Sequence, residues 1–205
     1  MKTFIALISL LAFTACKKSK IESVNTANST DSSYQPKSIG SQWSYRRTVA
    51  NVQNTTYKVI RLSSDTLAHG KTFNVFSSDD NSTDGVNQYI RRENDKYYSI
   101  LTASTNKPEL LILDAAKNVG ESWLGGVNGT NTYTFTMQEK IPVFQLDGFT
   151  FKNVLVVHLE KTGPNPASVD TYFAQGIGQV KSEGTITGGG ITVSVKVKVL
   201  TVDIK

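Results

Sequence analysis

Apolar and polar residues alternate with a period of two along most of the chain beyond residue 54. The alternating segments are short, rich in β-branched and aromatic residues, and separated by clusters of Asn, Asp, Gly, Ser or Pro, which is the pattern of half-buried β-strands. The segments predicted as strands are 55–62, 71–76, 87–92, 96–101, 110–113, 132–137, 149–159, 170–174 and 191–204. Only residues 114–117 favour a helix, of about one turn. The predicted class is all-β and mostly antiparallel.

The last predicted strand contains a change of phase. Alternate positions from Ile191 to Val199 are apolar, and the apolar positions then move by one residue to Leu200, Val202 and Ile204. Such a shift is typical of a β-bulge, and bulges bend sheets. We therefore expect a curved sheet that forms a closed or half-open barrel, since closure removes exposed edges. A two-sheet β-sandwich is the alternative.

The predicted strands fall into two similar halves. An apolar-Gly-x-x-Trp motif at residues 39–43 recurs at residues 119–123, and it contains both tryptophans of the chain, Trp43 and Trp123. Tyr57 and Tyr133 follow at corresponding positions, and later aromatic and glycine positions correspond as well. This indicates two repeats of about 80 residues, 39–118 and 119–205. The alternative is that the two halves look alike only because β-hairpins in general use the same turn glycines and aromatic residues.

The first 38 residues differ in composition from the rest. Residues 1–15 combine Lys2, a short apolar run from Phe4 to Phe13 and the small residues Thr14 and Ala15, which predicts a secretory signal peptide. The run is too short to cross a bilayer as a helix, which takes about 20 residues. Residues 16–38 are dominated by Ser, Thr, Asn and Lys and predict a flexible tether. Residues 39–205 then form the β-domain.

Composition excludes several classes of site. A single cysteine makes no intramolecular disulfide, and together with two histidines it cannot complete a Cys/His zinc site. The net charge of +5 lies mostly before residue 39, because the β-domain holds 17 basic and 15 acidic residues. The pairs Arg46-Arg47 and Arg91-Arg92 point to opposite faces of a strand, so they form salt-bridged or solvated faces and no stripe for nucleic acid.

Candidate catalytic and metal sites are weak. Asp79, Asp80 and Asp84 lie in an oxygen-rich segment that resembles a calcium loop, but Arg91 occupies the position where an EF-hand needs a bidentate glutamate. Residues 65–72 lack the first glycine of a phosphate-binding loop, and neither His69 nor His158 belongs to a nucleophile motif. We therefore expect no enzymatic activity, no cofactor and no metal.

The segment Phe13-Thr14-Ala15-Cys16 resembles the lipobox of bacterial lipoproteins. Together with the Ser/Thr/Asn-rich tether, the Gly-x-x-Trp motif and the segment 172–183, it makes the chain similar to the small, mostly uncharacterised β-rich lipoproteins of the Bacteroidota. This resemblance implies cleavage before Cys16, acylation of that cysteine and an outer-membrane anchor. Surface-exported members often have acidic residues after the cysteine, whereas Lys17 and Lys18 stand here, which favours the periplasmic side.

The sequence is compatible with two functions. In the first, the curved sheet encloses an apolar cavity that binds a lipid or other small hydrophobic ligand, with Trp43, Tyr57, Trp123 and Tyr133 as candidate ligand-binding residues. In the second, the domain is a structural or interaction subunit that presents its surface to an envelope protein or glycan and has no cavity. Of the adjacent Tyr97 and Tyr98, at least one would then face outward.

Overall fold

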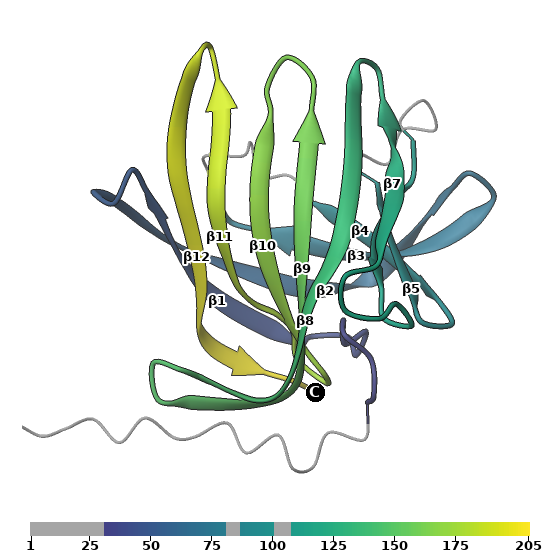
Figure 1. The fold of residues 1–205 in the computed structure, drawn as a ribbon. Coiled ribbons are helices and arrows are strands. Elements are labelled where there is room, and N and C mark those ends of the chain that lie inside the picture. Colours follow the sequence, from purple (N-terminus) through teal and green to yellow (C-terminus); the bar gives the residue numbers. More distant parts are fainter. Residues whose placement is uncertain (1–30, 81–86, 101–107) are drawn as a thin grey trace, which may run out of the picture.

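The computed structural model describes residues 31–80, 87–100 and 108–205. The predicted signal peptide, Cys16 and the tether up to residue 30 lie outside these ranges. The described residues form twelve strands (Figure 1): β1 (Gln42–Val49), β2 (Gln53–Ala68), β3 (Lys71–Ser78), β4 (Gln88–Glu93), β5 (Lys96–Ile100), β6 (Leu110–Asp114), β7 (Ser122–Asn128), β8 (Asn131–Leu146), β9 (Phe149–Thr162), β10 (Ala167–Ala174), β11 (Gly178–Gly188) and β12 (Ile191–Asp203). Within the described ranges, no helix is long and apolar enough to span a lipid bilayer.

All twelve strands belong to one antiparallel sheet with the order β6-β5-β4-β3-β2-β1-β12-β11-β10-β9-β8-β7. The chain therefore forms two consecutive six-stranded meanders, β1–β6 and β7–β12, joined by the pairing of β1 with β12. In Figure 1 the strands β8–β12 stand side by side, and β1–β5 cross behind them. The sheet is nearly closed into a barrel, which confirms the predicted fold class over the sandwich.

The expected bulge in the last strand is present. Ser44 pairs with Thr201 and the next residue, Tyr45, pairs with Val199, so Leu200 is the extra residue of β12. Two further irregularities bend the longest strands, between Arg61 and Asp65 in β2 and between Met137 and Glu139 in β8. Because a bulge increases local bending and twist, these three places turn the sheet around the interior.

The structure corrects part of the predicted strand list. Three strands were missed: β1, β7 and β11. The sequence of β7 contains Gly125-Gly126, that of β11 has few apolar residues, and β1 carries Arg46-Arg47, so each lacks the alternation that marks a strand. The predicted helical turn at 114–117 is wrong: Asp114 ends β6, and its carboxylate accepts a hydrogen bond from Ala116 N (3.2 Å) in a turn.

The two Gly-x-x-Trp motifs adopt the same local structure. Gly40 N donates to Arg61 O (2.9 Å), and Gly120 N donates to Met137 O (2.7 Å). Both glycines have positive φ, at 83° and 88°, where a side chain is strained. Each motif thus ties the start of a meander to the bend of its long second strand. The duplication itself stays a prediction.

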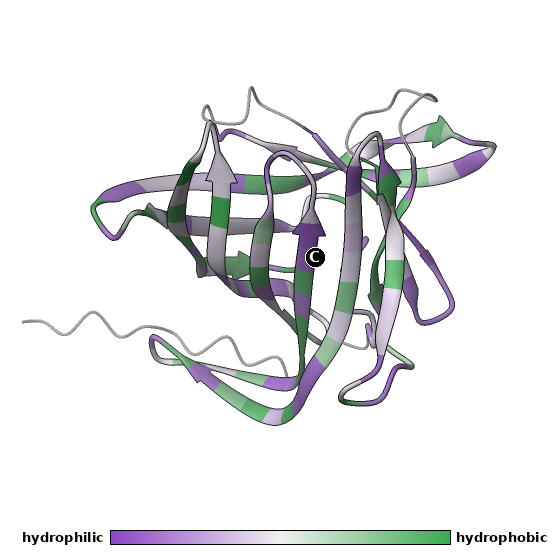
Figure 2. Cartoon of the chain, turned by 45° about the horizontal axis from the view of Figure 1, so that its top comes forward, coloured by the Kyte–Doolittle hydropathy of each residue, from purple (hydrophilic) through white to green (hydrophobic). Residues whose placement is uncertain are grey.

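The two edge strands, β6 and β7, meet at a seam. Trp123 Nε1 donates to Leu111 O (3.0 Å) across it. Gly125 permits this approach, because a Cβ at that position would lie 3.1 Å from Leu111 O and 2.2 Å from the Phe135 ring. Hydrophobic and hydrophilic residues alternate along several strands, as the green and purple bands of Figure 2 show, and successive residues of a strand point to opposite faces of the sheet.

Candidate ligand-binding cavity

The barrel contains a partly open cavity of about 310 Å³. Aromatic side chains dominate its wall: Tyr34, Trp43, Tyr45, Tyr57, Tyr97, Tyr133, Phe135 and Phe173. Aliphatic residues from β2, β4, β6 and β9 complete the apolar surface, for example Val59, Ile90 and Val157. Because the lining comes from both meanders, the cavity exists only in the closed sheet.

Three of the four candidate residues from the sequence, Trp43, Tyr57 and Tyr133, line this cavity. Trp43 is 2% exposed, and its indole N–H donates to Ile177 O (2.8 Å) in the turn before β11. Trp123 is not part of the wall. It stacks on Phe135 with a ring separation of 5.8 Å and takes part in the seam.

Sequence reasoning missed a wall formed by the N-terminal segment. Ser33 is buried, and its carbonyl accepts a hydrogen bond from Gly176 N (2.7 Å). The next residue, Tyr34, donates its N–H to Tyr97 Oη (2.7 Å) and packs edge-on against that ring. Tyr34 and Gln35 both line the cavity. The described end of the predicted tether therefore lies against the barrel; Tyr34 is the one aromatic residue of segment 16–38, which is the signal that could have revealed it.

Two tyrosines of β1 and β2 form a stacked pair in the wall. The rings of Tyr45 and Tyr57 lie 5.4 Å apart, and Tyr45 Oη donates to Gln179 O (2.9 Å). Burial and the nearby Asp80 carboxylate together raise the pKa of Tyr57 to about 12, although the Arg47 guanidinium lowers it in part. Burial also raises the pKa of Tyr45. Both hydroxyls therefore stay protonated around neutral pH and act as neutral polar groups.

An ion pair lies beside Tyr57. Arg47 Nη1 and Nη2 donate to the two carboxylate oxygens of Asp80 at 2.6 Å and 3.2 Å, and the guanidinium carbon is 6.0 Å from the centre of the Tyr57 ring. The side chains are 16% and 6% exposed. Arg47 thus neutralises Asp80 within a largely buried, bidentate contact.

The candidate calcium loop is only partly described, because Asp84 lies outside the described residues. Of the other two carboxylates, Asp80 pairs with Arg47 and Asp79 accepts a hydrogen bond from Lys58 N. In the described ranges, no three His, Cys, Asp or Glu side chains are grouped so that they could hold a metal ion. The carboxylate of Asp80 therefore pairs with the guanidinium of Arg47, a cation of the same chain.

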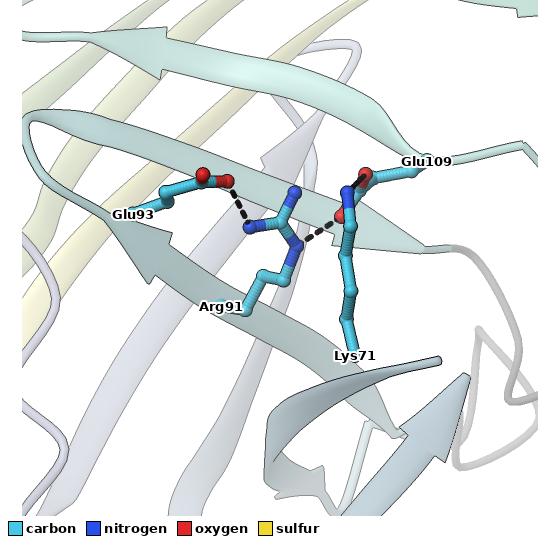
Figure 3. A network of polar contacts seen from close by, with 4 residues as sticks. All are labelled: Lys71, Arg91, Glu93 and Glu109. Atoms are coloured by element: carbon cyan, nitrogen blue, oxygen red, sulfur yellow. Dashed lines mark hydrogen bonds and ion pairs between the residues drawn. The ribbon is translucent and has the colours of Figure 1, made fainter. Parts of the chain in front are cut away.

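A second charged cluster lies at β3–β6 (Figure 3). Arg91 Nη1 donates to Glu93 Oε2 (2.7 Å), and Arg91 Nε donates to Glu109, which also accepts from Lys71 Nζ (3.0 Å). The Arg91 guanidinium lies 3.9 Å from the Tyr98 ring centre. Burial lowers the pKa of Arg91, but the two carboxylates outweigh it and raise that pKa overall. This confirms the salt-bridged interpretation of the Arg91-Arg92 pair.

Tyr97 and Tyr98 point to opposite faces of β5. Tyr97 is 2% exposed and faces the cavity, whereas Tyr98 lies under the guanidinium of Arg91. Neither ring is a bare aromatic surface.

One arrangement resembles a nucleophile triad. His158 Nδ1 lies 2.8 Å from Asp170 Oδ1, and Ser168 Oγ lies 3.5 Å from His158 Nε2. All three sit on β9 and β10, opposite the cavity face that carries Val157 and Leu159. The backbone of β10 is paired with β9 on one side and β11 on the other, so its amides are not free to form an oxyanion hole. The geometry fits a surface hydrogen-bond chain.

Comparison with known proteins identifies a fold. No family model and no curated protein sequence matches the chain. A proposed exported protein with a YmcC-like fold from Bacteroides fragilis aligns with a TM-score of 0.50 and 11% identity, over 82% of this chain and 97% of that chain. A proposed lipoprotein from Parabacteroides distasonis aligns with a TM-score of 0.48 and 10% identity, over 84% of this chain and 99% of that chain. At such identity, the likeness to the Bacteroides protein concerns the fold alone.

Proposed function

We propose that the protein is a lipid-anchored cell-envelope protein that binds a hydrophobic small molecule inside its barrel and catalyses no reaction. The observation that carries this proposal is the aromatic cavity of about 310 Å³. Ligand sites are typically concave, mostly apolar and about 300–1,000 Å³ in volume, with a few placed polar groups. The cavity lies at the lower end of that range.

The anchor is the second part of the proposal. Acylation of Cys16 attaches the chain to the outer membrane on its periplasmic side. A single acyl chain binds a membrane only reversibly, so stable attachment takes two or more. Replacing Cys16 by Ser should move the protein from the membrane fraction to the soluble fraction of its host. Retention of the C16S protein in the membrane would contradict the anchor.

The binding proposal is tested with protein purified from its own host. Native mass spectrometry should show a bound small molecule, and the neutral fluorescent probe N-phenyl-1-naphthylamine should bind the emptied protein. Leu159→Trp fills the cavity from β9, whereas Glu160→Trp places the same side chain on the opposite face of that strand. We expect L159W to lose the ligand and the probe, and E160W to keep both.

The proposal is wrong if the wild-type protein carries no bound molecule and does not bind the probe. It is also wrong if L159W and E160W bind the probe equally, because the site would then lie outside the barrel.

A further inference from the structure

Among the described residues, the wall of the cavity carries hydrogen-bonding groups but no charged side chain. Its polar members within 31–80, 87–100 and 108–205 are side-chain amides and hydroxyls, among them Gln35, Gln88, Ser99, Thr171 and Gln179, with no Asp, Glu, Lys, Arg or His. An ionised carboxylate placed in such a wall loses its hydration without gaining a counter-charge. Burying an unpaired charge is far more costly than burying a neutral polar group.

Two arginines lie against rings of the wall, Arg92 at 5.7 Å from the centre of the Tyr97 ring and Arg47 at 6.0 Å from that of Tyr57. Arg47 is the less exposed of the two, at 16% against 38%, and both of its terminal nitrogens donate to Asp80. Asp80 is 4% exposed, so this pair is held together away from water, where attraction between opposite charges is strong. An anionic ligand that approached Tyr57 would meet the carboxylate of Asp80 together with the guanidinium.

Tyr57 supplies a hydrogen-bond donor for a neutral ligand. Its ring lines the cavity and stacks on Tyr45, and among the described residues no group accepts a hydrogen bond from its hydroxyl. Because burial and Asp80 raise its pKa to about 12, the hydroxyl stays protonated and can donate to an alcohol, ether or carbonyl oxygen.

We infer, resting on the proposed function, that the cavity selects an uncharged amphiphile, an apolar body with a neutral oxygen acceptor, and that the Arg47–Asp80 ion pair beside Tyr57 prevents it from holding the corresponding anion. The ion pair determines specificity, because it holds the partly buried Arg47 near the ligand while Asp80 cancels its charge. Removing the carboxylate of Asp80 would leave that arginine able to pair with an anionic head group.

The test uses two ligands with the same apolar chain, 1-dodecanol and dodecanoate, each displacing N-phenyl-1-naphthylamine from the full-length protein at about pH 8, where a carboxylic acid is ionised. Wild-type protein should bind dodecanol at least about tenfold more tightly than dodecanoate. Asp80→Asn should strengthen dodecanoate binding by about tenfold or more and leave dodecanol binding nearly unchanged. Asp203→Asn is the matched control, since it removes one carboxylate from the exposed pair with Lys205.

The outcomes separate this inference from the proposed function. If the probe and both ligands fail to bind, the proposed function fails. If wild-type protein binds dodecanoate as tightly as dodecanol, the inference is overturned while a hydrophobic site stands. The same holds if D80N and D203N change dodecanoate affinity equally. Should D80N fail to fold, wild-type protein still decides: dodecanoate affinity must rise as the pH falls and its head group becomes neutral.

Discussion

The two halves of the sheet begin in the same way and then differ in chemistry. Gly40 and Gly120 have the same left-handed backbone and bind the bend of a 16-residue strand through equivalent hydrogen bonds. At that bend the first half places Arg61, which is 4% exposed, and the second places Met137, which is fully buried. The backbone geometry of a bend is thus compatible with either a polar or an apolar interior, provided that the surroundings match.

Those surroundings do match. Arg61 donates to Ser64 O (3.3 Å), Asn74 Oδ1 (2.8 Å), Asp65 and Leu62 O, so most of its donors are used at the bend itself. Met137 packs in a cluster that includes Trp123 and Phe135. The glycine and the backbone hydrogen bonds therefore determine the bend, whereas the neighbouring side chains determine whether a polar or an apolar residue is stable there. The following substitutions test this, starting with the largest expected effect.

Met137→Arg should be the most damaging change. It buries a guanidinium among apolar side chains with none of the acceptors that surround Arg61, which should lower the free energy of unfolding by about 3–5 kcal/mol or prevent folding. Urea denaturation followed by circular dichroism measures the loss. Met137→Leu, which conserves volume, should lose less than about 1.5 kcal/mol. An M137R protein as stable as wild type would show that the two bends are interchangeable.

The two tryptophans should separate stability from binding. Trp43→Ala and Trp123→Ala each remove a buried indole and should each lower the free energy of unfolding by about 3–5 kcal/mol. Only Trp43 belongs to the cavity wall, so W43A should also lose N-phenyl-1-naphthylamine binding while W123A keeps it. Equal loss of probe binding in both variants would place the seam within the site.

Arg61→Met should lower the free energy of unfolding less than Met137→Arg does. The methionine leaves carbonyl and amide oxygens at the bend without their donor, at a loss of about 1–3 kcal/mol in the free energy of unfolding. The backbone bonds of residue 61 with Gly40 and Ser41 do not involve the side chain and should persist. The exposed Arg46, changed to Met, serves as control and should shift stability by less than about 0.5 kcal/mol. Stabilisation by R61M would show that the polar bend is maintained for another reason.

Gly40→Ala and Gly120→Ala should give the smallest losses, and equal ones. A Cβ would find space at both positions, with Lys205 Cγ at 3.8 Å as the nearest atom at Gly40 and nothing within 4 Å at Gly120. The loss then comes from the positive φ alone, about 1–2 kcal/mol each. Gly188→Ala, also in open space but without a positive φ, is the control and should be nearly neutral. Unequal losses at 40 and 120 would break the correspondence of the two motifs.

Local pattern predicted what depends on neighbours along one strand. Alternation located most strands and the bulge at Leu200, and the shared context of the two tryptophans pointed to structurally equivalent places. Local pattern could not predict that Trp43 faces a cavity and Trp123 a seam, because that difference depends on which distant strand lies opposite each indole. The closure of the sheet determines which strands those are.

Contacts between distant segments explain the remaining errors. Tyr34 belongs to a polar segment that cannot form a core by itself, yet a turn at Gly176 and the hydroxyl of Tyr97 hold its backbone. Asp80 appears beside other acidic residues in the sequence, which favours a calcium loop, while its partner Arg47 lies 33 residues away. Neither pairing has a local signature.

The order of the strands has a consequence for how the chain could be rearranged. Every pairing in the sheet joins consecutive strands except β1 with β12, and there Lys205 N lies 3.2 Å from Ser41 Oγ, so the start of the first strand and the end of the last lie side by side. Joining these ends and opening the connection between β6 and β7 would give a circular permutant whose strands follow one another along the chain in the same order as around the barrel. Circular permutation is tolerated where termini are close and the new break falls in a surface connection. The connection between β6 and β7 is therefore the natural place for new ends. In such a permutant the β1–β12 pairing would become a local contact between consecutive strands, and the contact of Trp123 with Leu111 would join the two ends of the chain instead.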